Sequence, residues 1–130
     1  RGLGDVYKRQ MPQWANWVQN PGSWSDGERS ALTQVLEAAL AALPPDAEWL
    51  QRMDRAAQQW PNQHEMQYLA SCVFMRHSLW GKAQQALERC ANRLAHPSLR
   101  RQAWVRLAEL AEQRGDLNSA ARHWKQAAQA

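Results

Sequence analysis

The sequence predicts an all-α protein whose helical hairpins repeat along the chain and stack into a right-handed superhelix of roughly six or seven helices. The composition favours helix, because only six Gly, six Pro and two Tyr occur among 130 residues rich in Ala, Gln, Leu and Arg. Apolar residues also recur at helical spacing along most of the chain. The clearest run combines large and small apolar residues with a Gly-Asp turn: Trp104, Leu107, Ala108, Ala111, Gly115, Asp116, Ala120, Trp124 and Ala127.

The bulk properties describe a folded protein with a hydrophobic core. Hydrophobic residues make up 45% of the chain and charged residues 22%, which is typical of globular proteins. Eight Trp supply much of the buried area that a short helical repeat needs. Two Cys cannot form a disulfide framework, so a reducing compartment fits best. The sequence contains neither a signal peptide nor an apolar stretch of ~18 residues, so we expect no transmembrane helix within it.

The net charge of +4 is unevenly distributed. From Asn62 onward, ten Lys or Arg stand against five Asp or Glu, and this excess is spread over the expected helices. Nucleic-acid interfaces usually show a denser basic patch, so nucleic acid is not an expected partner. A basic face for an acidic partner or an anionic membrane surface stays open beside the favoured interpretation, a solvated helix face.

The N-terminal leader does not fit the helical pattern. Arg1–Gln10 lacks helical periodicity and the Trp, Gln and Ala of the following sequence. It is interpreted as a non-native or disordered leader that resembles a translated sequencing adaptor. The remaining chain is then expected to be the tail of a longer protein. Pro12–Val18 is expected to form a short helix with Trp14, Trp17 and Val18 on one face.

Two further helices complete a degenerate N-terminal unit, residues 11–62. Ser25 or Asp26 is expected to cap a helix that reaches about Leu43, and Glu28, three residues after Ser25, would complete a capping box. Its core stripe comprises Leu32, Val35, Leu36, Ala39, Leu40 and Leu43. Pro44 and Pro45 stop this helix, and Asp46 caps the next one. The core face of that next helix comprises Trp49, Leu50, Met53, Ala56 and Ala57.

Two better-formed hairpins follow, at residues 63–97 and 98–130. The first joins His64–His77 to Trp80–Leu94 across a turn at Ser78 and Leu79. Its core residues are expected to be Tyr68, Leu69, Ala70, Val73, Phe74, Trp80, Ala83, Leu87, Cys90, Ala91 and Leu94. In the second hairpin, Ser98 is expected to cap a helix that ends near Arg114. Gly115 and Asp116 then form a tight turn, and Leu117–Gln129 is the returning helix.

The two hairpins align with each other as repeats. Ala83 and Ala120 lie 37 residues apart, and the ~34-residue period of tetratricopeptide (TPR) repeats is met if three residues are inserted near Ala95–Ser98. Small residues then align with small ones and large mostly with large, as Leu87 does with Trp124. The chain is therefore similar to TPR proteins, with about two and a half units.

Four strings carry a closer resemblance. They are DAEWL at Asp46–Leu50, LWGKAQQ at Leu79–Gln85, RQAW at Arg101–Trp104 and LAELAEQRGD at Leu107–Asp116. These strings resemble the C-terminal region of the HemY family, proteobacterial inner-membrane proteins associated with protohaem synthesis. The resemblance covers about residues 24–130, and the Leu79–Ala83 string is its most distinctive part.

The resemblance implies a TPR-like domain preceded by two transmembrane helices that are missing from this chain. It implies a scaffold on the cytoplasmic face of the inner membrane that binds late haem-synthesis enzymes through protein–protein interactions. Two alternatives stay open. One is a generic TPR adaptor in another envelope process, and the other is a module that binds haem or porphyrin directly.

The histidines do not form an evident haem or metal site. His64, His77, His96 and His123 lack the i, i+4 spacing of a helical metal site. Capping or surface roles are therefore expected instead of axial ligation of haem. The sequence predicts no metal and no bound cofactor, and haem or porphyrin binding has no motif to support it.

Catalytic residues are not expected either. Glu109 and Glu112 lie beside Arg106 and Arg114 and are interpreted as ordinary surface pairs. No Ser, His and acid combination carries a turn motif known from hydrolases. The protein is therefore predicted to be no enzyme.

The predicted site is the groove that the first helices of TPR hairpins line. Its mixture of aromatic, soft and charged side chains is suited to a peptide or a partner helix. Tyr68 and Cys72 occupy the positions of the first Lys and the Asn in the carboxylate clamp of co-chaperone TPRs, which disfavours that kind of ligand. The predicted groove residues are Glu65, Tyr68, Cys72, Met75, Arg76, Gln102, Val105, Glu109, Glu112 and Gln113.

Overall fold

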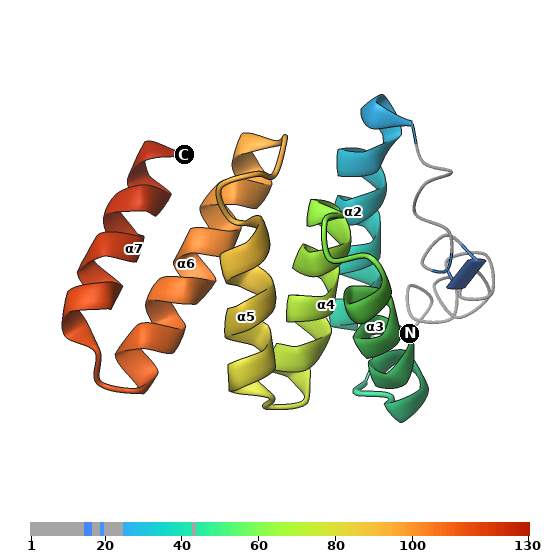
Figure 1. Cartoon of the computed structure of the whole chain (residues 1–130), viewed down its shortest axis with the longest axis horizontal. Helices are drawn as coiled ribbons and strands as arrows, with labels where there is room; N and C mark the ends of the chain where they lie inside the picture. Colours follow the sequence, from blue (N-terminus) through green and yellow to red (C-terminus); the bar gives the residue numbers. More distant parts are fainter. Residues whose placement is uncertain (1–14, 17–18, 20–24, 43) are drawn as a thin grey trace.

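The computed structural model describes residues 15–16, 19, 25–42 and 44–130, and this part of the chain is all-helical without any strand. Its six helices, labelled as in Figure 1, are α2 (Asp26–Ala42), α3 (Ala47–Gln59), α4 (His64–Arg76), α5 (Trp80–Cys90), α6 (Pro97–Gln113) and α7 (Leu117–Gln129). The all-α prediction is confirmed. The leader Arg1–Gln10, most of the expected helix Pro12–Val18, and Leu43 lie outside the described residues.

The helices form one array, with α2 and α3 at one end and α6 and α7 at the other (Figure 1). Helices α4 and α5 pack as one antiparallel hairpin and α6 and α7 as another. Successive pairs are joined because α3 packs on α4, α5 packs on α6, and α2 packs on α4. The core runs through the array, and its largest fully buried apolar side chains are Tyr68, Leu36, Met53, Met66, Leu69, Leu87, Leu94 and Leu107.

Two of the predicted helix starts are confirmed and one is wrong. The Ser25 Oγ accepts from Glu28 N at 3.3 Å and so caps α2, and it also donates to Glu28 Oε1 at 2.7 Å in place of the backbone contact of a full capping box. Asp46 Oδ1 accepts from Glu48 N at 2.7 Å and so caps α3. At α6, however, the cap is His96 and not Ser98, because His96 Nδ1 accepts from Ser98 N at 3.1 Å. Pro97 occupies the first helical position, where its missing N–H costs nothing.

The predicted core is mostly confirmed, with two exposed exceptions. Leu36 and Ala39 on α2 are buried, but Val35 is 46% exposed because it lies one step around the helix from them. Trp80 is 40% exposed because it begins α5, before the helix packs fully against its neighbours. Helix α5 also ends at Cys90, earlier than the expected Leu94, although Ala91 and Leu94 are buried as predicted.

The turn between α6 and α7 depends on glycine. Gly115 has φ +78°, a left-handed conformation that disfavours side chains. We expect Gly115→Ala to lower the free energy of unfolding by about 1 kcal/mol, although no atom lies within 4 Å of the added methyl. The matched substitution Gly81→Ala, inside α5 and equally unobstructed, is expected to raise it by about 0.5 kcal/mol. Urea unfolding of both variants measures the difference, and equal effects would contradict this account of the turn.

Candidate functional site

Helices α2, α4 and α6 each contribute a side chain to one polar cluster. The cluster comprises Glu37, Tyr68, Cys72 and Arg106. Tyr68 Oη donates to Glu37 Oε2 at 2.6 Å, and Arg106 Nη2 donates to the same oxygen at 2.8 Å. Arg106 Nη1 lies 2.7 Å from Cys72 Sγ, and this thiol lies 3.9 Å from Glu37 Oε2. One carboxylate oxygen therefore collects donors from two other helices.

Helical spacing on α4 and contacts between helices bring these residues together. Tyr68 and Cys72 are four residues apart, so they lie on the same face of α4. Glu37 and Arg106 approach from α2 and α6 on either side, 69 positions apart in sequence. The Arg106 guanidinium carbon also lies 5.3 Å from the centroid of the Tyr68 ring, within range of a cation–π contact. The polar cluster therefore connects the first and last thirds of the described chain across α4.

The cluster holds one ion pair and two neutral acids. The side chains of Arg106 and Glu37 are only 18% and 24% exposed, so solvent screens their 2.8 Å contact less than a surface pair. Burial raises the pKa of the Tyr68 phenol, which stays protonated and donates to Glu37. Burial also raises the pKa of the Cys72 thiol to about 11, and the neighbouring Arg106, which lowers it, does not compensate. Cys72 is therefore a neutral thiol at pH 7.

The raised pKa of Cys72 predicts slow thiol chemistry in the native protein. In a Cys90→Ala variant, we expect the rate of iodoacetamide labelling of Cys72 to stay low at pH 8 and to climb between about pH 9 and 11. Over this range the Cys72 thiol of the unfolded chain loses its proton at a lower pH than that of the folded chain. The free energy of unfolding therefore falls as the pH rises. A labelling midpoint below pH 8.5 would mean that Arg106, and not burial, controls this thiol.

A pocket of about 230 Å³ opens beside the polar cluster and is called the central pocket here. Its lining surface is mainly apolar, and Glu37, Cys72 and Arg106 of the polar cluster are among the residues that line it. The complete lining consists of Glu37, Leu40, Ala41, Cys72, Met75, Arg76 and Arg106. These residues come from α2, α4 and α6, so the pocket lies among these three helices.

The predicted groove residues on α4 divide between this pocket and the core. Cys72, Met75 and Arg76 line the central pocket. Tyr68 is fully buried and donates to Glu37, another residue of the pocket lining. Glu65 is only 6% exposed, so it is placed among the core residues and not on an open surface.

The predicted groove residues on α6 do not line the central pocket. Gln102 and Glu109 are exposed and Val105 is half-buried. Glu112 accepts from the Trp124 indole Nε1 at 3.0 Å, so it links α6 to α7. Gln113 lines a different pocket, between α5 and α6, together with Trp80 and Leu110.

The sequence did not predict two residues of the polar cluster, Glu37 and Arg106. The interpretation of Arg106 as a surface partner of Glu109 is wrong, since Arg106 reaches Glu37 instead. Arg114 likewise pairs with Asp116 at 3.6 Å. The available signal was the position of Glu37, a charge between the core residues Leu36 and Leu40. Its partner was not predictable because it is 69 residues away.

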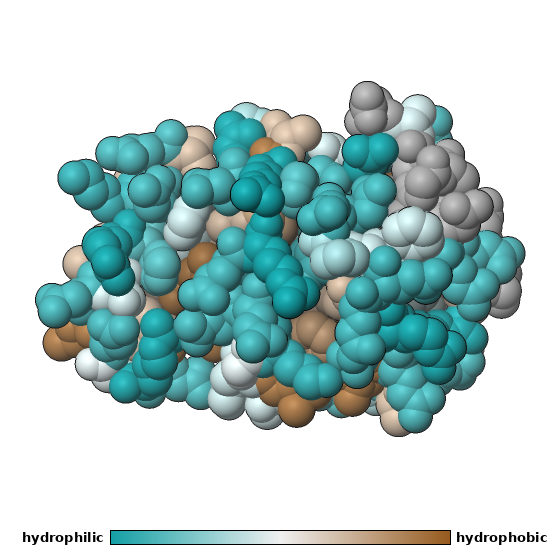
Figure 2. All heavy atoms as spheres, in the orientation of Figure 1, coloured by the Kyte–Doolittle hydropathy of each residue, from teal (hydrophilic) through white to brown (hydrophobic). Residues whose placement is uncertain are grey.

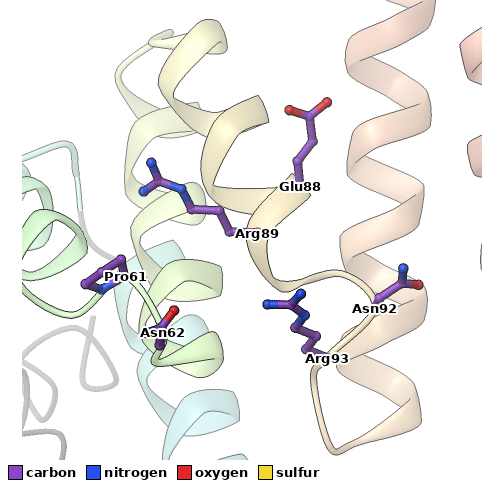
Figure 3. A pocket seen from close by; sticks show the side chains of 6 residues that line it. All are labelled: Pro61, Asn62, Glu88, Arg89, Asn92 and Arg93. Atoms are coloured by element: carbon purple, nitrogen blue, oxygen red, sulfur yellow. The ribbon is translucent and has the colours of Figure 1, made fainter.

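A second pocket, of about 410 Å³, has a different character. Figure 3 shows Pro61 and Asn62 from the α3–α4 turn facing Arg89 and Arg93, which come from α5 and the chain after it. Its other lining residues, Glu88 and Asn92, are also polar. The second pocket therefore lacks the apolar walls that ligand pockets usually have.

The face seen in Figure 2 is mostly hydrophilic, with small apolar patches near the α4–α5 and α6–α7 turns.

Two histidines have the capping roles that the sequence suggested, and a third has a role that it did not predict. His77 follows α4 as its C-cap, and His96 caps α6. His123 stacks on Trp104 with ring centroids 5.5 Å apart, and its partial burial lowers the pKa of its imidazole. Across residues 25–42 and 44–130, no three His, Cys, Asp or Glu side chains gather in a way that could hold a metal ion.

Comparisons with known proteins identify no relative that would assign a role to the site. No family model matches the chain, and no curated protein or solved structure is found to be similar to it. Among the described helices, none is both long and apolar enough to cross a membrane.

Proposed function

We propose that this chain is a non-catalytic, TPR-like scaffold that binds a protein partner at the surface shared by α2, α4 and α6. The observation that carries the proposal is the central pocket, whose mainly apolar lining comes from all three helices and includes residues of the polar cluster. In a stack of helical hairpins, the first helices line one continuous face, and such faces bind partner segments.

Several features support the TPR-like part of this proposal. Small residues are buried at positions that align between the two hairpins: Ser71 with Ala108, and Ala83 with Ala120. Gly115 provides a tight turn between α6 and α7. The buried Gln67 amide also donates to the carbonyls of Ala57 at 2.9 Å and Trp60 at 3.2 Å, which fixes the α3–α4 connection.

The size of the central pocket favours a side chain over a whole cofactor. At about 230 Å³ it is smaller than the ~300–1,000 Å³ of sites for drug-sized ligands. It is nevertheless several times the ~30 Å³ that one water molecule occupies in the liquid. A single large side chain that anchors a protein partner matches this volume, and such anchors dominate the energetics of many interfaces.

The HemY-like strings extend the proposal to a pathway. The expected partners are late haem-synthesis enzymes, and the scaffold would work at the cytoplasmic face of a bacterial inner membrane. Membrane attachment would come from helices outside this chain. A generic TPR adaptor of another envelope process remains the alternative, and it would use the same surface.

The test is affinity purification of the full-length protein from proteobacterial membranes, with one variant that fills the central pocket. Leu40→Trp adds a ring within the pocket lining, whereas Leu117→Trp makes the same change at a 71% exposed position on α7. We expect late haem-synthesis enzymes to co-purify with the wild type and Leu117→Trp, and to be lost from Leu40→Trp.

The other outcomes distinguish an error in the binding surface from an error in the pathway. If Leu40→Trp retains the partners of the wild type, the α2–α4–α6 surface is not the binding site. If only enzymes of another process are recovered and are lost from Leu40→Trp, the scaffold stands and the haem pathway is wrong. A haem titration addresses the remaining alternative, because a Soret shift that disappears in His-to-Ala variants would indicate a haem-binding module.

A further inference from the structure

The second pocket presents two arginine side chains that have no partner in the described part of the chain. Arg89 lies on α5, and Arg93 lies four residues later, where Leu94 N still donates to the Cys90 carbonyl at 3.1 Å and continues the helical turn. Residues four apart on a helical turn lie on the same side, and both arginines line the pocket. Across the described helices and turns, neither guanidinium makes a hydrogen bond or an ion pair. Two like charges therefore meet at the pocket, which destabilises a helix.

The nearby acids do not neutralise these two charges. Glu88 also lines the pocket, but Figure 3 shows that it points away from the two guanidinium groups, and its Oε2 accepts from Gln84 Nε2 at 3.2 Å. Asp54 shares with Arg89 the lining of a smaller pocket of about 150 Å³, but its carboxylate pairs with Lys82 Nζ at 3.0 Å. The second pocket therefore keeps two positive charges for a guest.

The chemistry of the arginine pair favours a phosphate group. The planar fork of a guanidinium matches the oxygens of a carboxylate or a phosphate. A phosphate monoester carries about −1.5 to −2 charges at pH 7, so it neutralises both arginines, whereas a carboxylate neutralises one. A phosphate between them also removes their mutual repulsion.

The rest of the pocket favours a small polar molecule as the carrier of this phosphate. Its volume of about 410 Å³ lies within the ~300–1,000 Å³ of small-molecule sites. Asn62 and Asn92 line it, and their amides can donate to and accept from hydroxyl groups. Pro61 is its only apolar lining residue, so the aromatic anchors that dominate protein interfaces would have little to pack against.

We propose that the second pocket binds a small, hydroxyl-rich phosphate ester, the class of ligand that sugar phosphates represent. The phosphate lies between Arg89 and Arg93, and the hydroxyl groups bond to Asn62 and Asn92. This site is separate from the central pocket and does not depend on the scaffold function.

Isothermal titration calorimetry of the purified chain, at constant ionic strength, tests this site. The probe is glucose-6-phosphate, and its matched controls are neutral glucose, the carboxylate gluconate, and inorganic phosphate. We expect glucose-6-phosphate to bind about tenfold more tightly than gluconate, because only the phosphate engages both arginines. Inorganic phosphate should bind about threefold more weakly than glucose-6-phosphate, since it lacks the hydroxyl contacts, and glucose should not bind measurably.

Two double variants separate the site from the overall charge of the protein. Arg89→Gln with Arg93→Gln should weaken glucose-6-phosphate binding by about tenfold or more. Arg55→Gln with Arg101→Gln removes the same charge from exposed positions of α3 and α6, and should change the affinity by less than about twofold. Circular dichroism of both variants checks that helicity is retained.

Several results would overturn the phosphate site: no binding of glucose-6-phosphate, equal affinity for gluconate, or the same loss of binding in both double variants. A phosphoserine peptide is the final probe. If it binds more than about tenfold more tightly than glucose-6-phosphate, the guest is a phosphorylated protein and the small-molecule site is wrong. None of these results bears on the purification experiment with Leu40→Trp, which tests the scaffold function at the central pocket.

Discussion

Replacing Arg106 by Met is expected to lower the free energy of unfolding by about 2–4 kcal/mol, measured by urea denaturation. Removal of the guanidinium leaves the Glu37 carboxylate, 24% exposed, with the Tyr68 hydroxyl as its remaining strong donor. A charge that is partly buried and has lost its counter-ion costs more than a surface charge. Met retains most of the apolar stem, so the effect reports the charge and its hydrogen bonds.

Two further variants control this measurement. Arg101→Met makes the same change at an exposed position of α6, and we expect an effect below about 0.5 kcal/mol. Adding Glu37→Gln to Arg106→Met should recover part of the lost stability, because a neutral amide tolerates the site without a counter-ion. Similar stabilities for Arg106→Met and Arg101→Met would show that the polar cluster does not connect α2 to α6 energetically.

Leu87→Ala is expected to destabilise the protein by about 3–5 kcal/mol, the range for a large core side chain whose cavity cannot collapse. Leu87 is fully buried on α5, which packs on α4 and on α6. The position that aligns with it in the last hairpin is Trp124 on α7, which is 40% exposed. Trp124→Ala is therefore expected to cost less, about 2 kcal/mol, although it removes the larger side chain.

This pair of variants compares aligned positions in two hairpins, so it tests burial separately from residue size. Thermal and urea unfolding give both values on the same chain. Equal destabilisation by the two substitutions would mean that α7 is packed as tightly as α5, against the exposure of Trp124. A larger cost for Trp124→Ala would contradict the described core outright.

Local chemistry explains why most helices were predictable from sequence. The Ser25 and Asp46 caps, and the left-handed Gly115, depend on residues within four positions of one another. Apolar spacing placed the core of α3 correctly. On α4 it predicted five buried residues but missed Met66, Gln67 and Ser71. Val35 was misplaced because a stripe of apolar residues wider than the packed face contains positions that remain in solvent.

The site was less predictable because it depends on side chains far apart in sequence. Met75 and Arg76 were found by their register on a first helix, which is local information. Glu37 and Arg106 resembled ordinary surface charges, and only the tertiary fold brings α2 and α6 close enough for them to pair. Glu65 was misassigned: it shares the helix face of Tyr68 and Cys72, but it is buried and does not line the central pocket.

Photocrosslinking at the central pocket tests most directly whether a protein docks there. p-Benzoylphenylalanine is placed at Ala41, which is exposed and lines the pocket, or at the exposed Ala128 of α7 as the control, in the full-length protein in proteobacterial cells. The account predicts a discrete adduct from Ala41 that contains a late haem-synthesis enzyme and disappears with Leu40→Trp. The same adduct from both positions, or one that persists in Leu40→Trp, would contradict docking at this pocket.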